Sequence, residues 1–177
     1  IYGETLPEGA EILIPGSYTT ANFLLDFYLG QAVPKRSLPF DRLYEQLLET
    51  PNATGVVIHE KRFTYQADGL TLIADLGEHW EQHTGMPIPL GAIALRSDLP
   101  LQETIELHIQ QSLAWAKAND AEAFALCQEY AQDLSPAVVR AHIDLYVNDF
   151  SYNVGEEGQK AVEFFLKAQS EFLKEQE

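Results

Sequence analysis

The segment ILIPGSYTTANFLLDFYLG, residues 12–30, reads as a strand, a turn and a helix in direct succession. The apolar run at its start predicts a short buried strand that ends at Pro15 and Gly16. From Thr20 to Leu29 apolar residues recur at helical spacing, and Gly30 is a typical helix stop. A strand that leads through a tight turn into a helix is the repeating unit of an α/β fold.

The same alternation continues to about residue 97. We predict further strands at residues 36–40, 56–58, 70–74 and 92–95, with helices at residues 41–49 and 75–84. Strands separated by helices favour a largely parallel sheet with right-handed crossovers.

Residues 98–177 are different in style. They predict four helices and no strand, at residues 101–118, 121–132, 136–147 and 155–174. The pair Ser135-Pro136 is a clear helix start, with serine as the N-cap and proline at the first position. We therefore expect an α/β domain over residues 1–97 that carries the ligand-binding loops, followed by a helical segment over residues 98–177.

Charge narrows the range of partners. The 177 residues carry a formal net charge of −16, which argues against binding nucleic acid or an anionic membrane surface. An anionic small molecule remains possible, because a local site can be positive within an acidic protein. No run of about 18 apolar residues exists, so no membrane span is expected. We expect a cytoplasmic protein.

Two predicted strand ends are candidate ligand sites, since ligands of open parallel sheets bind beyond the carboxyl ends of the strands. The first is the turn with Thr19, Thr20 and Ala21. Free backbone N–H groups at a helix start, together with the threonine hydroxyls, suit a carboxylate or phosphate. Taken alone, the motif favours a simpler interpretation, in which one threonine caps the helix.

The second strand end carries His59, directly after the apolar run at residues 56–58. An imidazole titrates near neutrality, so at this position it can take or give a proton. Glu60 or Arg62 could orient it. A structural histidine bonded to a loop carbonyl is an equally good interpretation of the spacing.

Other chemical candidates are weaker. His79 and His83 share a helix face, but no third metal ligand is evident and we expect no metal site. We predict that Cys127, the single cysteine, is buried rather than nucleophilic, and that Trp80 and Trp115 belong to the core.

Longer motifs resemble a known family, 1,4-dihydroxy-6-naphthoate synthase of the futalosine route to menaquinone. The similar stretches are PGSYTTA at residues 15–21, GVVIHEKRFTY at residues 55–65, DLGEHWEQHTGMPIPLG at residues 75–91 and YVNDFSYNVGEEG at residues 146–158. They occur in the family's order and at close to its spacing, and the resemblance covers nearly the whole chain.

The resemblance implies a fold like that of type II periplasmic binding proteins, with two lobes around a cleft. It implies a lyase that releases 1,4-dihydroxy-6-naphthoate from cyclic dehypoxanthinylfutalosine, with no metal or organic cofactor. The family's proton acceptor matches His59, and its threonine-alanine ligand contact matches Thr20 and Ala21. Thr19 and Arg62 join them as candidate substrate-binding residues, although Arg62 could equally pack beneath its loop.

One departure from the family affects the site. The chain lacks about the first third of the family's sequence, which forms much of the first lobe. We therefore expect an incomplete cleft, an inactive isolated chain, and either self-association or a complementary N-terminal piece. Two other functions stay open. One is a solute-binding protein of the same fold without catalysis, and the other is chorismate dehydratase of the same pathway.

Overall fold

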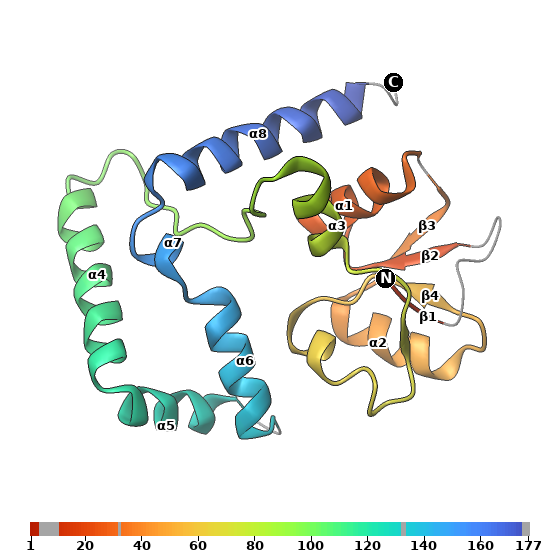
Figure 1. Cartoon of the computed structure of the whole chain (residues 1–177), viewed down its shortest axis with the longest axis horizontal. Coiled ribbons are helices and arrows are strands. Elements are labelled where there is room, and N and C mark those ends of the chain that lie inside the picture. Colours follow the sequence, from red (N-terminus) through yellow and green to blue (C-terminus); the bar gives the residue numbers. More distant parts are fainter. Residues whose placement is uncertain (4–10, 32, 132–133, 175–177) are drawn as a thin grey trace. The chain divides into compact units, whose positions relative to one another are not determined.

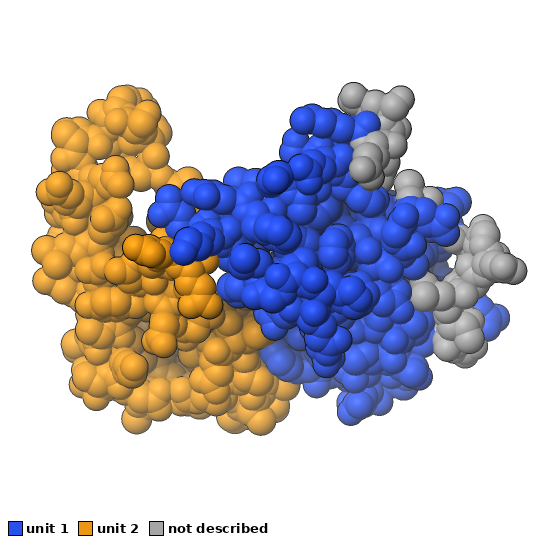
Figure 2. Space-filling view, turned by 45° about the horizontal axis from the view of Figure 1, so that its top comes forward, with its two compact units in different colours: residues 1–90, 159–177 blue, residues 91–158 orange. Residues whose placement is uncertain are grey.

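The computed structural model of the chain describes residues 1–3, 11–31, 33–131 and 134–174. The chain forms two compact units, one of residues 1–90 with 159–177 and one of residues 91–158 (Figure 2). The division falls at residue 90 rather than at the predicted residue 97. The greater part of the last helix also belongs to the first unit, because its apolar side chains pack there.

A five-stranded mixed sheet forms the centre of unit 1. Its order is β3-β2-β4-β1-β5. The strands are β1 (Tyr2–Gly3), β2 (Ile12–Ile14), β3 (Lys35–Ser37), β4 (Thr54–Gly55) and β5 (Thr71–Leu72). β2 is parallel to β3 and β4, as predicted. β1 was not predicted, because two residues are too short for a pattern, and it pairs antiparallel with β4 and β5.

Helices cover both faces of this sheet (Figure 1). α1 (Thr20–Leu29), α3 (Leu76–Thr84) and α8 (Gly155–Lys174) lie on one side, and α2 (Phe40–Glu49) lies on the other. Ile12 and Ile14 belong to the core cluster shared with α1, α3 and α8, whereas Leu13 packs with Leu43 and Leu47 of α2. Successive strand residues point to opposite faces, so a fully apolar β2 is what a sheet covered on both sides requires.

The helices of unit 2 are α4 (Gln102–Ala118), α5 (Asp120–Tyr130), α6 (Pro136–Tyr146) and the short α7 (Asp149–Tyr152). Arg140 joins α6 to α5 through two hydrogen bonds to Asp120, of 2.7 and 2.9 Å. Among the described residues of this unit, Val139 is the one buried apolar side chain. The first three helices match the prediction closely, except that the predicted end at residue 132 lies outside the described residues.

Three predictions for residues of unit 2 are wrong. Residues 92–95 form no strand, and Ile93 is 76% exposed. Trp115 is 51% exposed and Cys127 is exposed, although both were expected to be buried. A strand needs a neighbouring backbone and a core residue needs a facing layer, and neither can be seen in a local sequence pattern. Trp80, in contrast, is fully buried as predicted. No helix in the described ranges is both long and apolar enough to cross a bilayer.

Candidate functional site

Three chain segments leave the sheet at one edge. In the parallel strands, Leu13 pairs with Arg36 of β3 and with Gly55 of β4, so all three strands end at the same edge. The residues that follow them are the turn at 15–19, the connection at 38–39 that leads into α2, and the segment at 56–59. Both predicted site loops therefore lie at the carboxyl edge of the sheet, where open α/β sheets bind ligands.

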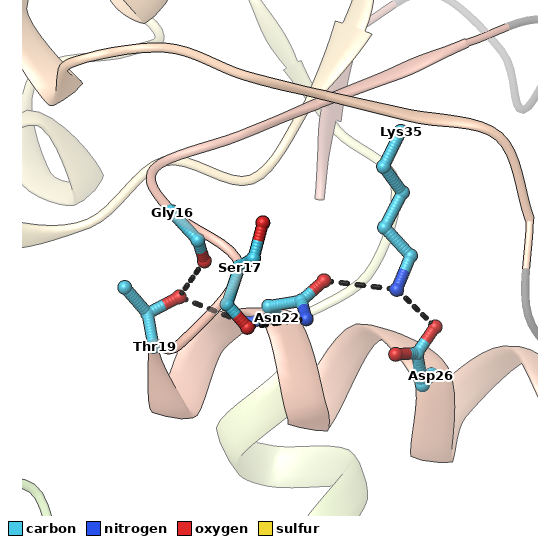
Figure 3. Close-up of polar contacts among 6 residues, drawn as sticks. All are labelled: Gly16, Ser17, Thr19, Asn22, Asp26 and Lys35. Atoms are coloured by element: carbon cyan, nitrogen blue, oxygen red, sulfur yellow. Dashed lines mark hydrogen bonds and ion pairs between the residues drawn. The ribbon is translucent and has the colours of Figure 1, made fainter. Parts of the chain in front are cut away.

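The turn after β2 is closed by its own polar groups (Figure 3). Thr19 is the N-cap of α1: its Oγ1 donates a hydrogen bond to the carbonyl of Gly16 at 2.7 Å and accepts one from the backbone N–H of Asn22 at 3.2 Å. Gly16 has a φ of +152°, and an added Cβ would lie 3.2 Å from Cγ2 of Thr19. The Thr19 hydroxyl thus has the capping role that its motif alone favoured.

A second set of contacts braces the first turns of α1. Asn22 donates from Nδ2 to the carbonyl of Ser17 at 2.9 Å and accepts at Oδ1 from Nζ of Lys35, also at 2.9 Å. Lys35 also forms an ion pair with the buried Asp26 (Figure 3). This network ties β3 to α1 and holds the helix start in place. Sequence patterns did not indicate it, because its members lie far apart in the chain.

The helix start keeps free hydrogen-bond donors. In the described part of the chain, the backbone N–H groups of Thr20 and Ala21 have no acceptor, as expected for the first turn of a helix. Both residues are half-buried. These two free N–H groups are the feature of the turn that suits an anionic group. The Thr19 hydroxyl is not part of it, because it caps the helix.

His59 lies where the extended chain after β4 changes direction. Val56 and Val57 pack against opposite cores, and His59 then opens the 3-10 helix η1 (His59–Phe63). Its φ is +60°, a left-handed backbone uncommon in residues other than glycine. The imidazole is exposed, and its ring lies 5.1 Å from the ring of Phe40 at 70°. The alternative prediction, a bond to a loop carbonyl, is wrong: in the described ranges the imidazole makes no hydrogen bond.

Arg62, at the other end of η1, contacts the protein itself. Its Nη2 lies 3.0 Å from Oδ2 of Asp75, the N-cap residue of α3, and both side chains are about one-third exposed. Oδ1 of Asp75 accepts from the backbone N–H groups of Gly77 and Glu78 at 2.9 and 3.2 Å. One side of the guanidinium therefore anchors η1 to α3. A substrate contact by its other nitrogens stays a prediction.

Tyrosines fill the space around η1. The rings of Tyr2 and Tyr65 meet edge to face at 4.7 Å. The hydroxyl of Tyr44 donates to Asp68 at 2.7 Å, and the Lys61 ammonium lies over the Tyr44 ring. Burial raises the pKa of Tyr2 to about 12, and burial followed by the Asp68 hydrogen bond raises the pKa of Tyr44. Both phenols are therefore neutral proton donors at physiological pH.

The sequence profile described as menaquinone biosynthesis matches residues 3–171. The chain belongs to this family.

Two relatives in the menaquinone biosynthesis family carry the name 1,4-dihydroxy-6-naphthoate synthase. The one from Thermus thermophilus is 41% identical over 169 residues, which cover 94% of this chain and 62% of the relative. The one from Streptomyces coelicolor is 36% identical over 167 residues, which cover 89% of this chain and 58% of the relative. The family resemblance seen in the motifs is confirmed. The chain spans about three fifths of the length of these relatives.

A solved structure is also similar. The crystal structure of a protein from Archaeoglobus fulgidus superposes with a TM-score of 0.83 at 32% sequence identity. The match covers 92% of this chain and 62% of the other chain.

The residues predicted from sequence as a candidate site are only partly brought together in the structure. Thr19, Thr20, Ala21 and His59 lie at one sheet edge, while Arg62 is engaged by Asp75. No group of three potential metal ligands is found among the described residues. A shallow hollow lined by Tyr65, Gln66, Gly69, Leu70, Thr71 and Leu72 lies beside the edge strand β5 and contains none of the predicted site residues. Phe40, the last residue of the strand predicted at residues 36–40, instead begins α2 and contacts His59, a contact that the sequence pattern did not indicate.

Proposed function

We propose that this chain forms part of a lyase that releases 1,4-dihydroxy-6-naphthoate from cyclic dehypoxanthinylfutalosine in menaquinone biosynthesis, with His59 as the general base. The observation that carries the proposal is the placement of His59. Its imidazole is exposed and its backbone is left-handed. It lies at the carboxyl edge of the sheet, where α1 presents free N–H groups. The names of both curated relatives support the reaction.

Each site residue has a role in the proposal. The substrate carboxylate accepts hydrogen bonds from the backbone N–H groups of Thr20 and Ala21, and the hydroxyl of Thr20 adds a further donor. Thr19 closes the turn beneath them, since its own hydroxyl is occupied. His59, neutral before the reaction, removes a proton from the substrate and starts the bond cleavage that yields the aromatic product. Arg62 contributes to the wall of the site while Asp75 holds it.

The proposed fold is like that of type II periplasmic binding proteins, of which this chain supplies the lobe described as unit 1. Exposed apolar side chains on the helices of unit 2 support the need for a further segment, a complementary piece or a second copy of this chain. They include Leu107, Trp115, Leu126, Tyr130, Phe150 and Tyr152. Large exposed apolar areas are typical of surfaces that pack against another polypeptide.

A chimera tests the reaction. The part of the Thermus thermophilus synthase that this chain matches is replaced by the chain, and product is measured by absorbance and mass spectrometry. We expect turnover by the chimera and none by the 177-residue chain alone. Turnover by the isolated chain would show that no further segment is needed. Binding of the substrate without product in a correctly folded chimera would favour the solute-binding function instead.

Substituting His59 tests the general base. In the chimera, His59→Asn is expected to lower kcat by about a hundred- to ten-thousand-fold while KM changes little. Asparagine is the suitable replacement, because it tolerates a left-handed backbone and so leaves the turn unstrained. The matched control is His108→Asn, an exposed histidine on α4. Normal turnover by the His59→Asn chimera would contradict the assignment.

A further inference from the structure

Phe40 and His59 meet although their strands are not neighbours. Phe40 follows β3 and His59 follows β4, and these strands flank β2 in the sheet. Their rings form an edge-to-face pair, with centroids 5.1 Å apart and planes at 70°. The pair therefore joins the two outer loops of the candidate site.

Core packing does not explain the presence of a phenylalanine at position 40. The side chain is 48% exposed and belongs to neither core cluster of the described chain. It occupies the first position of α2, where the preceding Pro39 provides no side-chain cap. Replacing a large apolar side chain at an exposed helix start should cost the protein little stability. A use for the Phe40 ring is therefore best sought in its contact with His59.

His59 needs an orienting contact. A general base is commonly held by a polar third group, such as a carboxylate. Among the described residues the imidazole has no hydrogen-bonding or ionic partner, and Phe40 supplies its one aromatic contact. The left-handed backbone sets the direction of the Cα–Cβ bond but does not by itself fix the two side-chain torsions.

We propose that Phe40 is a positioning residue that holds the His59 imidazole in one orientation through this edge-to-face contact. The proposal rests on the proposed role of His59 as the base. Such aromatic pairs favour one arrangement by roughly two- to tenfold, which is enough to bias the rotamers of an exposed imidazole. A base that spends more time in the productive orientation raises kcat rather than substrate affinity.

The test compares three variants. Phe40→Leu keeps an apolar side chain and removes the ring, whereas Phe40→Tyr keeps the ring. Leu48→Ala is the matched control, because Leu48 lies on the same helix and is also 48% exposed. In the 177-residue chain, three-bond couplings measured by NMR report the χ1 rotamers of His59. In the chimera, kcat and KM are measured with the proposed substrate.

We expect Phe40→Leu to reduce the dominant His59 rotamer preference and kcat together, each by about two- to tenfold, with KM within about twofold. Phe40→Tyr should keep the rotamer preference and kcat close to those of the parent, and Leu48→Ala should change neither quantity. Unchanged His59 couplings in Phe40→Leu would overturn the positioning role of Phe40, and so would a loss of kcat in Phe40→Tyr equal to that in Phe40→Leu. Either result would leave the proposed function intact. Normal turnover by His59→Asn would instead overturn the proposed function, and with it the positioning role.

Discussion

His79 and His83 stack on one face of α3, with ring centroids 3.9 Å apart. Nδ1 of His83 lies 2.8 Å from the carbonyl oxygen of His79. The His79 ring also meets the ring edges of Phe27 and Tyr28, at 5.9 and 4.9 Å. Burial lowers the pKa of His79 below its ordinary value of 6.5, and the charge of neighbouring His83 lowers it further.

His79 makes the free energy of unfolding depend on pH. Because the pKa of His79 is lower in the folded state than in the unfolded chain, the native state binds fewer protons around pH 6. The contribution of His79 is therefore complete above about pH 6.5 and is lost as the pH falls through the folded-state value. We expect the free energy of unfolding, measured by urea titration, to fall between pH 7 and 5.

Variants separate this effect from the rest of the acidic chain. His79→Gln should flatten the slope of the unfolding free energy against pH in that interval. His83→Gln should raise the pKa of His79 in an NMR titration, since it removes the neighbouring charge. His108→Gln, on an exposed face of α4, serves as the control. Equal slopes of the unfolding free energy against pH in the parent and in His79→Gln would show that His79 does not cause the pH dependence.

At the scale of elements, the helix starts that carry a side-chain cap could mostly be predicted, whereas strand bounds could not. The start of α2 was misplaced: Asp41 was a candidate N-cap, but it lies inside the helix, after Pro39 and Phe40. Thr19, Asp75 and Ser135 each cap a helix as the sequence indicates, because a cap bonds to groups two or three residues away. The strand predicted at residues 56–58 is instead β4 at Thr54–Gly55. Its position depends on pairing with β1 and β2, which lie far away in the chain.

Asp75 joins two elements and gives a testable case. Asp75→Ala removes the cap of α3 and the ion-pair partner of Arg62, and should lower the free energy of unfolding by about 1–2 kcal/mol. Asp75→Asn keeps an acceptor for the N–H groups of Gly77 and Glu78, so we expect a smaller loss. Urea denaturation followed by circular dichroism measures both. Equal losses in the two variants would show that the cap contributes little.

At the scale of the molecule, α8 completes the core of unit 1 from the far end of the sequence. Phe165 is 4% exposed, and its ring lies 5.0 Å from Phe23 and 5.2 Å from Trp80. The first 90 residues therefore do not contain their whole hydrophobic core. This is why a division of the chain by sequence style alone separates segments that pack together.

Phe165→Ala tests this packing. Loss of a buried phenylalanine side chain should lower the free energy of unfolding of unit 1 by about 3–5 kcal/mol. Trp80 fluorescence reports on this core, and a Trp115→Phe background removes the signal of the second tryptophan, which is in unit 2. Leu166→Ala, at a position 57% exposed on the same helix, is the control and should change stability by less than about 0.5 kcal/mol. Equal effects of the two variants would contradict a core role for α8.

The sequence by itself determined the longer helices, the caps Thr19, Asp75 and Ser135, the apolar residues of β2, the family resemblance and the presence of Thr20, Ala21 and His59 just after predicted strands. These features depend on hydrogen bonds and periodicities within a few residues. Only the tertiary structure decided the mixed sheet, the exposure of Trp115, the return of α8 to unit 1 and the Phe40–His59 contact. Strand pairing and burial depend on segments distant in the chain, so no local pattern contains them.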